Sequence, residues 1–252
     1  MTWSIIAKDT DTGFFSIAIA SRFFAVGALC PWTQAGTGAV CTQAMLNPLW
    51  GPQGLALLRD GLGPSDSCAK LIRADRGSAA RQVHMIDARG HTAAHTGTEC
   101  VPWCGHLAGD GVSVAGNMLA GPEVVGQALA AYRANGDRAF VERLLGAMEA
   151  GEAAGGDKRG KQSVAIRIQG PEPYPRLDIR VDDHPDPLPE LRRLYDIAKQ
   201  RFIPFSVAFP GRAEPHGITD RAFLETIIER EAGKPLGAEF SVGNRIGGNI
   251  RR

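Results

Sequence analysis

The sequence predicts an α+β protein in which layers of antiparallel β-sheet are covered by paired helices. Short β-rich runs come in groups along the chain, and helical segments follow them mostly in pairs. This order lacks the strict strand–helix alternation of a parallel doubly wound fold. Of the 252 residues, 44% are hydrophobic and 22% are charged, so the chain can bury a core without disulfides or a metal.

The first 20 residues predict a β-hairpin. Short β-rich runs at 3–8 and 14–20 flank DTDTG at 9–13, a cluster of residues that favour turns. Further strands are expected where other β-rich runs lie between turn-forming residues. These runs lie at 38–43, 82–87, 92–96, 112–115, 162–168 and 177–181.

Helices are expected where apolar residues recur at helical spacing between capping residues. Such segments lie at 53–60, about 66–74, 122–134, 138–150, 187–201 and 220–231. Ser65, Asp137 and Asp186 are the expected N-caps of three of these helices, and Pro187 fits the first helical position after Asp186.

The sequence changes character after residue 202. From there it is rich in proline and glycine around one helical stretch. We therefore expect a main domain at 1–202 and a C-terminal extension at 203–252 that is not an independent catalytic domain.

Composition argues against several classes of function. Lysine and arginine total 28, and aspartate and glutamate total 27. The resulting net charge of +1 does not indicate a basic surface for binding nucleic acid. No apolar run reaches the roughly 18 residues of a membrane span, and the N-terminus lacks the features of a signal peptide. Five cysteines, an odd number, are expected to be reduced thiols in a cytoplasmic protein.

Thr2 is the first candidate for chemistry. Methionine before a small residue is normally trimmed, and a free α-amino group has a reference pKa of about 7.7–8.0. Thr2 would then carry both a nucleophilic hydroxyl and the base that activates it, on a rigid strand. The alternative is that Thr2 is simply the first residue of an edge strand.

Arg22 and Asn117 are the next candidates. Arg22 is the only basic residue between Lys8 and Arg59, and the hairpin should bring it close to Thr2. An ordinary exposed arginine at a strand end is an equal alternative. Asn117 ends a strand before a helix, where its amide and nearby backbone N–H groups could hold an oxyanion or simply form a turn.

Three further clusters are better explained by structure than by chemistry. GGDKRGKQS at 155–163 could cradle an anion, but it lacks the order of a phosphate loop and precedes a strand, so a tight turn is favoured. HTGTECVPWCGH at 95–106 has an uncommon spacing for zinc, and DDHPD at 182–186 fits a turn with helix caps. We expect no metal and no cofactor.

Seven segments together resemble the DUF1028 family, a domain of unknown function placed in the N-terminal nucleophile (Ntn) hydrolase superfamily. They span about residues 1–195 and read MTWSIIAKD, IAIASRFFAVGALCPW, GTGAVCTQAMLNPLWGPQGLALL, HTGTECVPWCGH, VAGNMLAGPEVV, AAGGDKRGKQSVA and LDIRVDDHPDPLPELRRL. The resemblance implies a four-layer αββα sandwich of two antiparallel sheets, with the nucleophile at the free start of the first strand. It makes Thr2 the leading candidate.

The strand end at Ser21–Arg22 also resembles the one beside the nucleophile in proteasome-type subunits. Those sites use a lysine to lower the pKa of the nucleophile, whereas this chain has no lysine from Asp9 to Ala69. Arg22 could supply a positive field there, but it cannot shuttle protons.

These expectations combine into an Ntn-type hydrolase that cleaves a C–N amide or ureido bond of a small metabolite. Thr2 would attack the carbonyl carbon, Asn117 would stabilise the oxyanion, and Arg22 would favour the neutral amine. Side chains expected to line the substrate pocket are Ser21, Gln43, Asn47, Asp157 and Ser163. We also expect a homo-oligomer. The alternatives are a non-hydrolytic ligand-binding or assembly module on the same fold, or a cyclohydrolase or transferase.

Overall fold

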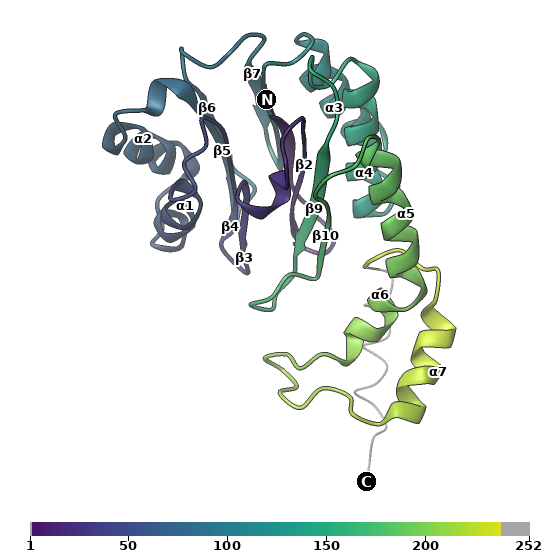
Figure 1. Cartoon of the computed structure of the whole chain (residues 1–252). Helices are drawn as coiled ribbons and strands as arrows, with labels where there is room; N and C mark the ends of the chain where they lie inside the picture. The colour runs from purple at the N-terminus through teal and green to yellow at the C-terminus, as the bar shows by residue number, and fades with distance from the viewer. Residues whose placement is uncertain (1, 238–252) are drawn as a thin grey trace.

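Two antiparallel β-sheets form the centre of the computed structural model, which describes residues 2–237 (Figure 1). The larger sheet has the strand order β10-β9-β2-β1-β8-β7, and the smaller sheet has the order β3-β4-β5-β6. The strands of the larger sheet are β1 (Thr2–Lys8), β2 (Phe15–Ser21), β7 (Gly105–Gly109), β8 (Val112–Asn117), β9 (Ser163–Gln169) and β10 (Leu177–Val181). Those of the smaller sheet are β3 (Pro31–Gln34), β4 (Gly38–Ala44), β5 (Arg81–Asp87) and β6 (Thr92–Thr96).

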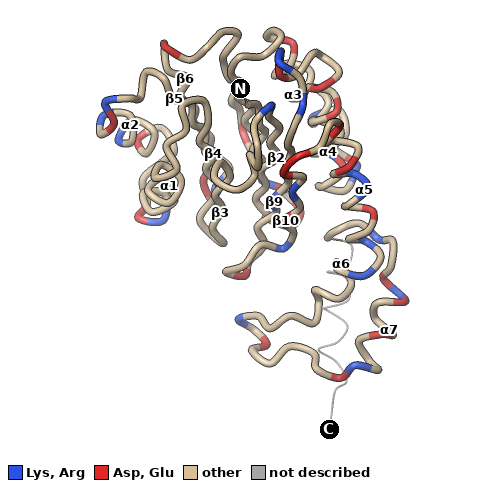
Figure 2. The backbone as a smooth tube through the Cα atoms, viewed as in Figure 1, with Lys and Arg blue, Asp and Glu red and all other residues tan. Residues whose placement is uncertain are grey.

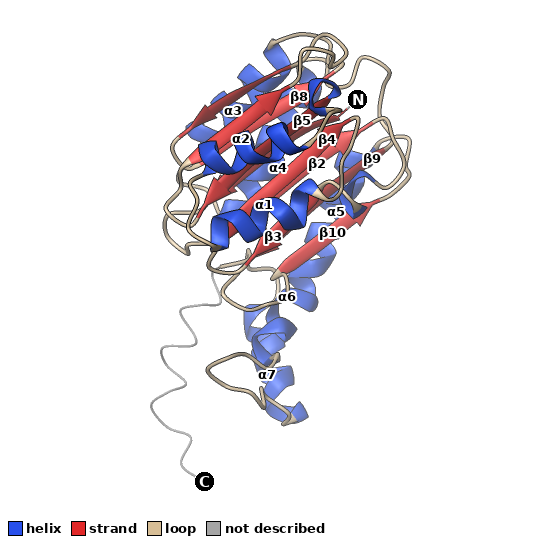
Figure 3. Cartoon of the chain, turned by 90° about the vertical axis from the view of Figure 1, so that its left-hand side faces the viewer, coloured by secondary structure: helices blue, strands red, loops and turns tan. Residues whose placement is uncertain are grey.

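Helices cover the outer face of each sheet, which gives four layers (Figure 1, Figure 3). The helices are α1 (Trp50–Arg59) and α2 (Pro64–Ala74) on the smaller sheet, and α3 (Glu123–Ala134), α4 (Phe140–Ala153) and α5 (Pro187–Gln200) on the larger one. The predicted α+β sandwich of two antiparallel sheets is therefore confirmed.

The alternation of side chains along β1 decides which residues face each layer. Trp3 and Ile5 belong to the core beneath α3, α4 and α5, whereas Ile6 belongs to the core between the two sheets. The ring of Trp3 lies against Gly151 of α4, so closely that a Cβ at Gly151 would come within 2.4 Å of it. Since neighbouring residues of a strand face opposite sides, Thr2 faces the smaller sheet.

Several element boundaries differ from the predicted ones. α2 begins at Pro64 with Gly63 as N-cap, not after Ser65, because proline is well suited to the first helical position. α4 begins at Phe140 with Ala139 rather than Asp137 as N-cap. α1 begins at Trp50, three residues before the predicted start, and α5 has the predicted N-cap with proline directly after it.

Two strands were not predicted. β3 reads PWTQ and β7 reads GHLAG, and neither has the run of β-branched and aromatic residues that signals a strand. Pairing defines them instead: β3 pairs with β4, and β7 pairs with β8.

The described part of the C-terminal extension contains α6 (Phe202–Phe205) and α7 (Arg221–Glu231), which lie beyond one edge of the sheets (Figure 1). Leu224 and Ile228 of α7 pack with Ala208 in a small cluster of their own. Leu236 returns to the core beside α5, where its backbone N–H donates to Tyr195 at 3.3 Å. Residues 238–252 of the predicted extension lie outside the described residues.

Charged side chains gather on the helices and turns and are sparse along the central strands (Figure 2). Within residues 2–237, no helix combines the length and apolar character that a bilayer crossing requires. Any chemistry between the sheets therefore depends on neutral polar groups more than on charges.

Candidate active site at the start of the first strand

Four polar residues lie side by side across the larger sheet, and we call them the polar row. Thr2 of β1 pairs with Ser21 of β2 on one side and with Asn117 of β8 on the other. Ser21 pairs in turn with Ser163 of β9. Residues directly opposite each other in antiparallel strands point to the same face, so the whole row faces the smaller sheet. All four are buried, and Thr2 retains 6% exposure.

Thr2 is held from both neighbouring strands. Its hydroxyl oxygen lies 3.2 Å from Ser21 Oγ, and its backbone carbonyl accepts from Asn117 Nδ2 at 3.3 Å. Asn117 Nδ2 also donates to Gln82 Oε1 at 3.1 Å. An amide nitrogen carries two hydrogens, so both donors of the Asn117 side chain are engaged. Asn117 therefore positions Thr2, and it could donate to an oxyanion only by releasing one of these bonds.

A buried hydrogen-bond network supports the polar row from the smaller sheet. Gln82 Oε1 accepts from Asn117 and, at 2.7 Å, from Gln43 Nε2. Gln82 Nε2 donates to Thr96 Oγ1 at 2.8 Å and to the carbonyl of Gly116 at 2.9 Å. Because a buried amide is costly unless its hydrogen bonds are satisfied, this network fixes the orientation of its members.

Ser4 and His84 form a second buried contact, 2.8 Å from Oγ to Nε2. The Ser4 hydroxyl donates its one hydrogen to Gln43 Oε1 at 2.7 Å, so His84 Nε2 must donate to Ser4 and Nδ1 must accept from Ser113 at 3.0 Å. Burial, with His106 as a further cause, lowers the pKa of His84 to about 3. Ser4 and His84 have no exposed surface, so the pair links the sheets and is no accessible nucleophile and base.

Arg22 lies next to the polar row, but its side chain points to a different segment. The guanidinium is exposed and donates to the carbonyl of Lys161 at 2.7 Å. The backbone N–H of Arg22 donates to Asp157 Oδ2 at 2.8 Å, and Asp157 also pairs with Arg159. Among the described residues, no contact joins the guanidinium to Thr2. Asp157 thus fixes the end of β2.

Ser163 and Asn47 also have structural partners. The Ser163 hydroxyl donates to the carbonyl of Phe23 at 2.5 Å and accepts from the N–H of Val26 at 3.2 Å, so it holds the loop after β2. Asn47 Nδ2 donates to Asp75 at 2.6 Å, and its Oδ1 accepts from the N–H of Leu49, which ties the start of α1 to the end of α2. The structure therefore brings Thr2, Ser21, Gln43 and Asn117 together and uses Asn47 elsewhere.

The sequence reasoning missed Ser4, Gln82 and His84. One signal was available: Gln82 and His84 are two residues apart on a predicted strand, as are Thr2 and Ser4, so each pair shares one face. Polar residues at such spacing within otherwise apolar strands indicate a buried polar face.

Three non-glycine residues near the site adopt left-handed backbone conformations. They are Ala25 after β2 (φ 51°), Ala44 at the end of β4 (φ 69°) and Met118 directly after Asn117 (φ 58°). Each costs about 1–2 kcal/mol relative to ordinary conformations, and such residues cluster at functional sites. Their position at the strand ends of the polar row and its network favours this region as the functional site.

Neither a metal nor a thiolate is indicated here. No group of three or more potential ligands within residues 2–237 is placed to hold a metal ion. The five cysteines are free thiols. Burial raises the pKa of Cys30 and that of Cys68 to about 12, which keeps both protonated near neutral pH.

Residues 2–191 match the sequence model of a family of unknown function, DUF1028. The chain belongs to the DUF1028 family. The crystal structure of protein SPO2555 from Silicibacter pomeroyi, a DUF1028 protein, is similar to this one, with a TM-score of 0.81. The two sequences are 32% identical, and the match covers 87% of this chain and 96% of SPO2555. The predicted family resemblance is confirmed.

A second solved structure is much more distant from this DUF1028 protein. Anbu (ancestral beta-subunit) from Yersinia bercovieri is 11% identical with a TM-score of 0.37, covering 83% of this chain and 98% of that chain. Comparison with curated proteins found no match.

Proposed function

We propose that this DUF1028 protein is an Ntn-type hydrolase that cleaves a C–N amide or ureido bond of a small molecule, with Thr2 as nucleophile after removal of Met1. The observation that carries the proposal is the position of Thr2. Its hydroxyl lies at the start of a central strand, within the polar row and 3.2 Å from the hydroxyl of Ser21. A strand of a packed sheet is a rigid support for a nucleophile.

The reaction would proceed through an ester. Thr2 Oγ1 attacks the carbonyl carbon, and its proton passes to the α-amino group of Thr2. The amino group then gives this proton to the leaving nitrogen as the C–N bond breaks. In the second half, the amino group takes a proton from water, the resulting hydroxide attacks the ester carbon, and the C–O bond to Thr2 breaks. The protonated amino group gives its proton to Thr2 Oγ1 as this bond breaks, which restores the hydroxyl, and the acid product leaves.

Neighbouring residues would position Thr2. Ser21 Oγ is close enough to orient the hydroxyl of Thr2 and to relay its proton. Asn117 holds the carbonyl of Thr2, and Gln82 holds Asn117. If the oxyanion displaces one partner of the Asn117 amide, the same side chain becomes a donor to the transition state.

Three measurements test this proposal. Intact-mass analysis shows whether Met1 has been removed, and a screen of small amides, ureido compounds and dipeptides identifies turnover. Thr2→Ala should lower kcat/KM by several orders of magnitude, and Thr2→Ser should keep part of the activity. The matched control is Thr10→Ala, in the exposed turn after β1, which should leave activity unchanged. Full activity in Thr2→Ala, or in protein that retains Met1, would contradict the proposal.

One observation favours a second function, a non-hydrolytic binding module. Thr2 is only 6% exposed, and both hydrogens of the Asn117 amide are already used. A site with so little exposed surface would bind a small ligand that takes over the hydrogen bonds of the Asn117 amide and does not react with Thr2. Ligand binding that survives in Thr2→Ala, with no product formed by the wild-type protein, would support this alternative.

A further inference from the structure

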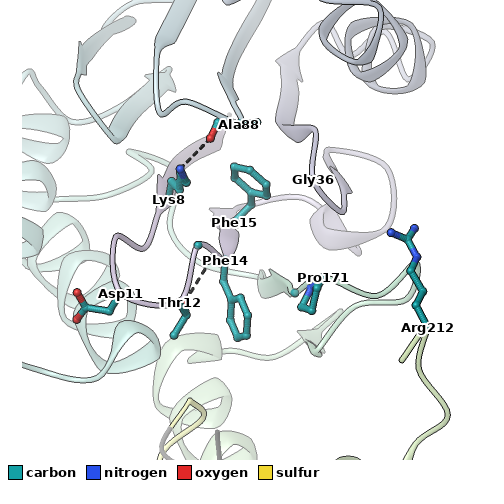
Figure 4. A pocket seen from close by; sticks show the side chains of 11 residues that line it. Lys8, Asp11, Thr12, Phe14, Phe15, Gly36, Ala88, Pro171 and Arg212 are labelled. Carbon is teal, nitrogen blue, oxygen red and sulfur yellow. Dashed lines mark hydrogen bonds between the residues drawn. The ribbon is translucent and has the colours of Figure 1, made fainter. Parts of the chain in front are cut away.

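A cavity lies at the other end of β1 from Thr2. Its volume is about 610 Å³, within the range of small-molecule sites. It is lined by Lys8 at the end of β1, by the turn that follows, and by Arg212 of the C-terminal extension (Figure 4). Since Thr2 and Lys8 are six residues apart on one strand, the cavity lies roughly 20 Å from the polar row.

Two cations line this cavity without carboxylate partners. Lys8 Nζ donates to the backbone carbonyl of Ala88 at 2.8 Å, and within the described residues neither Lys8 nor Arg212 takes part in an ion pair (Figure 4). Asp11 is the one acidic residue of the lining, and its exposed side chain lies on the far side of the turn from Arg212 (Figure 4). The lining therefore carries two cations and one carboxylate.

The position of Arg212 is fixed by its backbone. Its N–H donates to both carboxylate oxygens of Glu172, each at 3.1 Å, which anchors the extension to the turn after β9. Tyr174 donates to the carbonyl of Pro210 at 2.6 Å, two residues before Arg212. These bonds leave the guanidinium free to meet a ligand, while the segment that carries it is held in place.

The remaining lining is apolar. Phe14 and Phe15 reach this lining but belong to two core clusters and are only 5% and 3% exposed, so they add little surface, whereas Pro171 is exposed. Pro171 lies beside them, between Phe14 and Arg212 (Figure 4). An inorganic anion would satisfy the cations but leave this apolar surface in contact with water, whereas a purely apolar ligand would desolvate Lys8 and Arg212 without a partner. The lining suits a molecule that combines both properties.

We propose that this cavity binds a small aromatic carboxylate. The carboxylate would accept charge-assisted hydrogen bonds from Arg212, and the aromatic body would lie between Arg212 and Lys8, against Pro171 and the small exposed parts of Phe14 and Phe15 (Figure 4).

Binding of 3-phenylpropionate to the full chain tests this site, with 3-phenylpropanol as the uncharged analogue. Ligand-observed NMR titration and melting temperature are the two readouts. The acid should bind and raise the melting temperature, and the alcohol should bind at least about tenfold more weakly. Arg212→Gln should weaken binding of the acid at least about tenfold, and Lys8→Gln should weaken it less, because Lys8 lies across the cavity from Arg212.

Two variants serve as controls. Arg193→Gln, an exposed arginine on α5, should bind as the wild type does. Thr2→Ala should also bind normally, which separates this site from the polar row. The proposal is overturned by absence of binding at about 10 mM acid, by equal affinity for the alcohol, or by unchanged affinity in Arg212→Gln. Arg212 is exposed, so this last variant remains decisive even if Lys8→Gln does not fold.

Discussion

The side-chain amide of Asn117 donates to the backbone carbonyl of Thr2 across two adjacent strands, at 3.3 Å. The first residue of β1 is therefore held by a side chain from β8, in addition to the hydrogen bonds of the sheet. The second hydrogen of the same amide goes to Gln82 in the opposite sheet. Asn117 thus couples the position of Thr2 to the packing of the two sheets.

Asn117→Ala should impair both stability and turnover. Loss of two buried hydrogen bonds should cost about 1–3 kcal/mol of unfolding free energy. Because Thr2 loses its positioning partner, we expect kcat to fall at least about tenfold with a smaller change in KM. The matched control is Asn135→Ala, which loses one bond to Ala131 at the end of α3 and should keep its kcat. Unchanged kcat in Asn117→Ala would remove this residue from the site.

Gln82→Met should destabilise the protein strongly. The substitution keeps the size of the side chain but removes one buried hydrogen bond each from Asn117, Gln43 and the carbonyl of Gly116. We expect a loss of about 3–5 kcal/mol, measured by urea unfolding.

The matched control for that change is Gln162→Met. Gln162 is half-buried, and within the described residues its side chain makes one hydrogen bond, at 3.0 Å to Asp183, so its loss should cost under about 1 kcal/mol. Equal effects of the two substitutions would mean that the network around Gln82 does not stabilise the packing of the sheets.

Local sequence signals predicted the strands and helices well where neighbouring residues decide the conformation. The turn cluster at 9–13 predicted the β1–β2 hairpin, and the strands at 92–96 and 177–181 have the predicted bounds. β3 and β7 could not be predicted in the same way, because β3 has only two strand-favouring residues, Trp32 and Thr33, β7 is bounded by glycines, and pairing with β4 and β8 makes them strands.

The site was predicted only in part, since its contacts join distant segments. The pairing of Thr2 with Ser21 follows from the hairpin. In contrast, Ser4 contacts His84, which lies 80 residues away in the sequence, and the guanidinium of Arg22 donates to Lys161, 139 residues away. Such contacts depend on how the two sheets stack and on which loops close over the strand ends, and local patterns do not encode either.

Acid should destabilise the protein through His84. Burial lowers the pKa of His84 from its ordinary value of 6.5 to about 3. Between pH 3 and pH 6.5, His84 binds a proton in the unfolded chain but not in the folded chain. The free energy of unfolding therefore falls as the pH falls below 6.5, whereas above pH 6.5 His84 has little effect on it. From pH 7 to pH 5, His84 should account for a loss of about 2 kcal/mol.

Urea unfolding of His84→Gln at the same two pH values measures this contribution. The variant should lose about 2 kcal/mol less than the wild type between pH 7 and pH 5, because glutamine does not titrate. His216→Gln, an exposed histidine in the extension, should follow the wild type. An equal pH dependence in His84→Gln and the wild type would show that His84 is not buried as a neutral ring.

Arg22→Gln distinguishes an electrostatic role of this residue from a positioning role. The guanidinium is exposed and bonded to the carbonyl of Lys161, and solvent screens the interaction of such a charge with the amine of Thr2. Glutamine retains a donor of similar reach. We therefore expect kcat/KM to fall by the same factor, about threefold, at every pH. Asp157→Ala should reduce activity further, because it releases the backbone N–H of Arg22 at the end of β2. If the guanidinium instead lowers the pKa of the amine, Arg22→Gln will shift the acidic limb of the kcat/KM profile to higher pH, and the positioning role will be wrong.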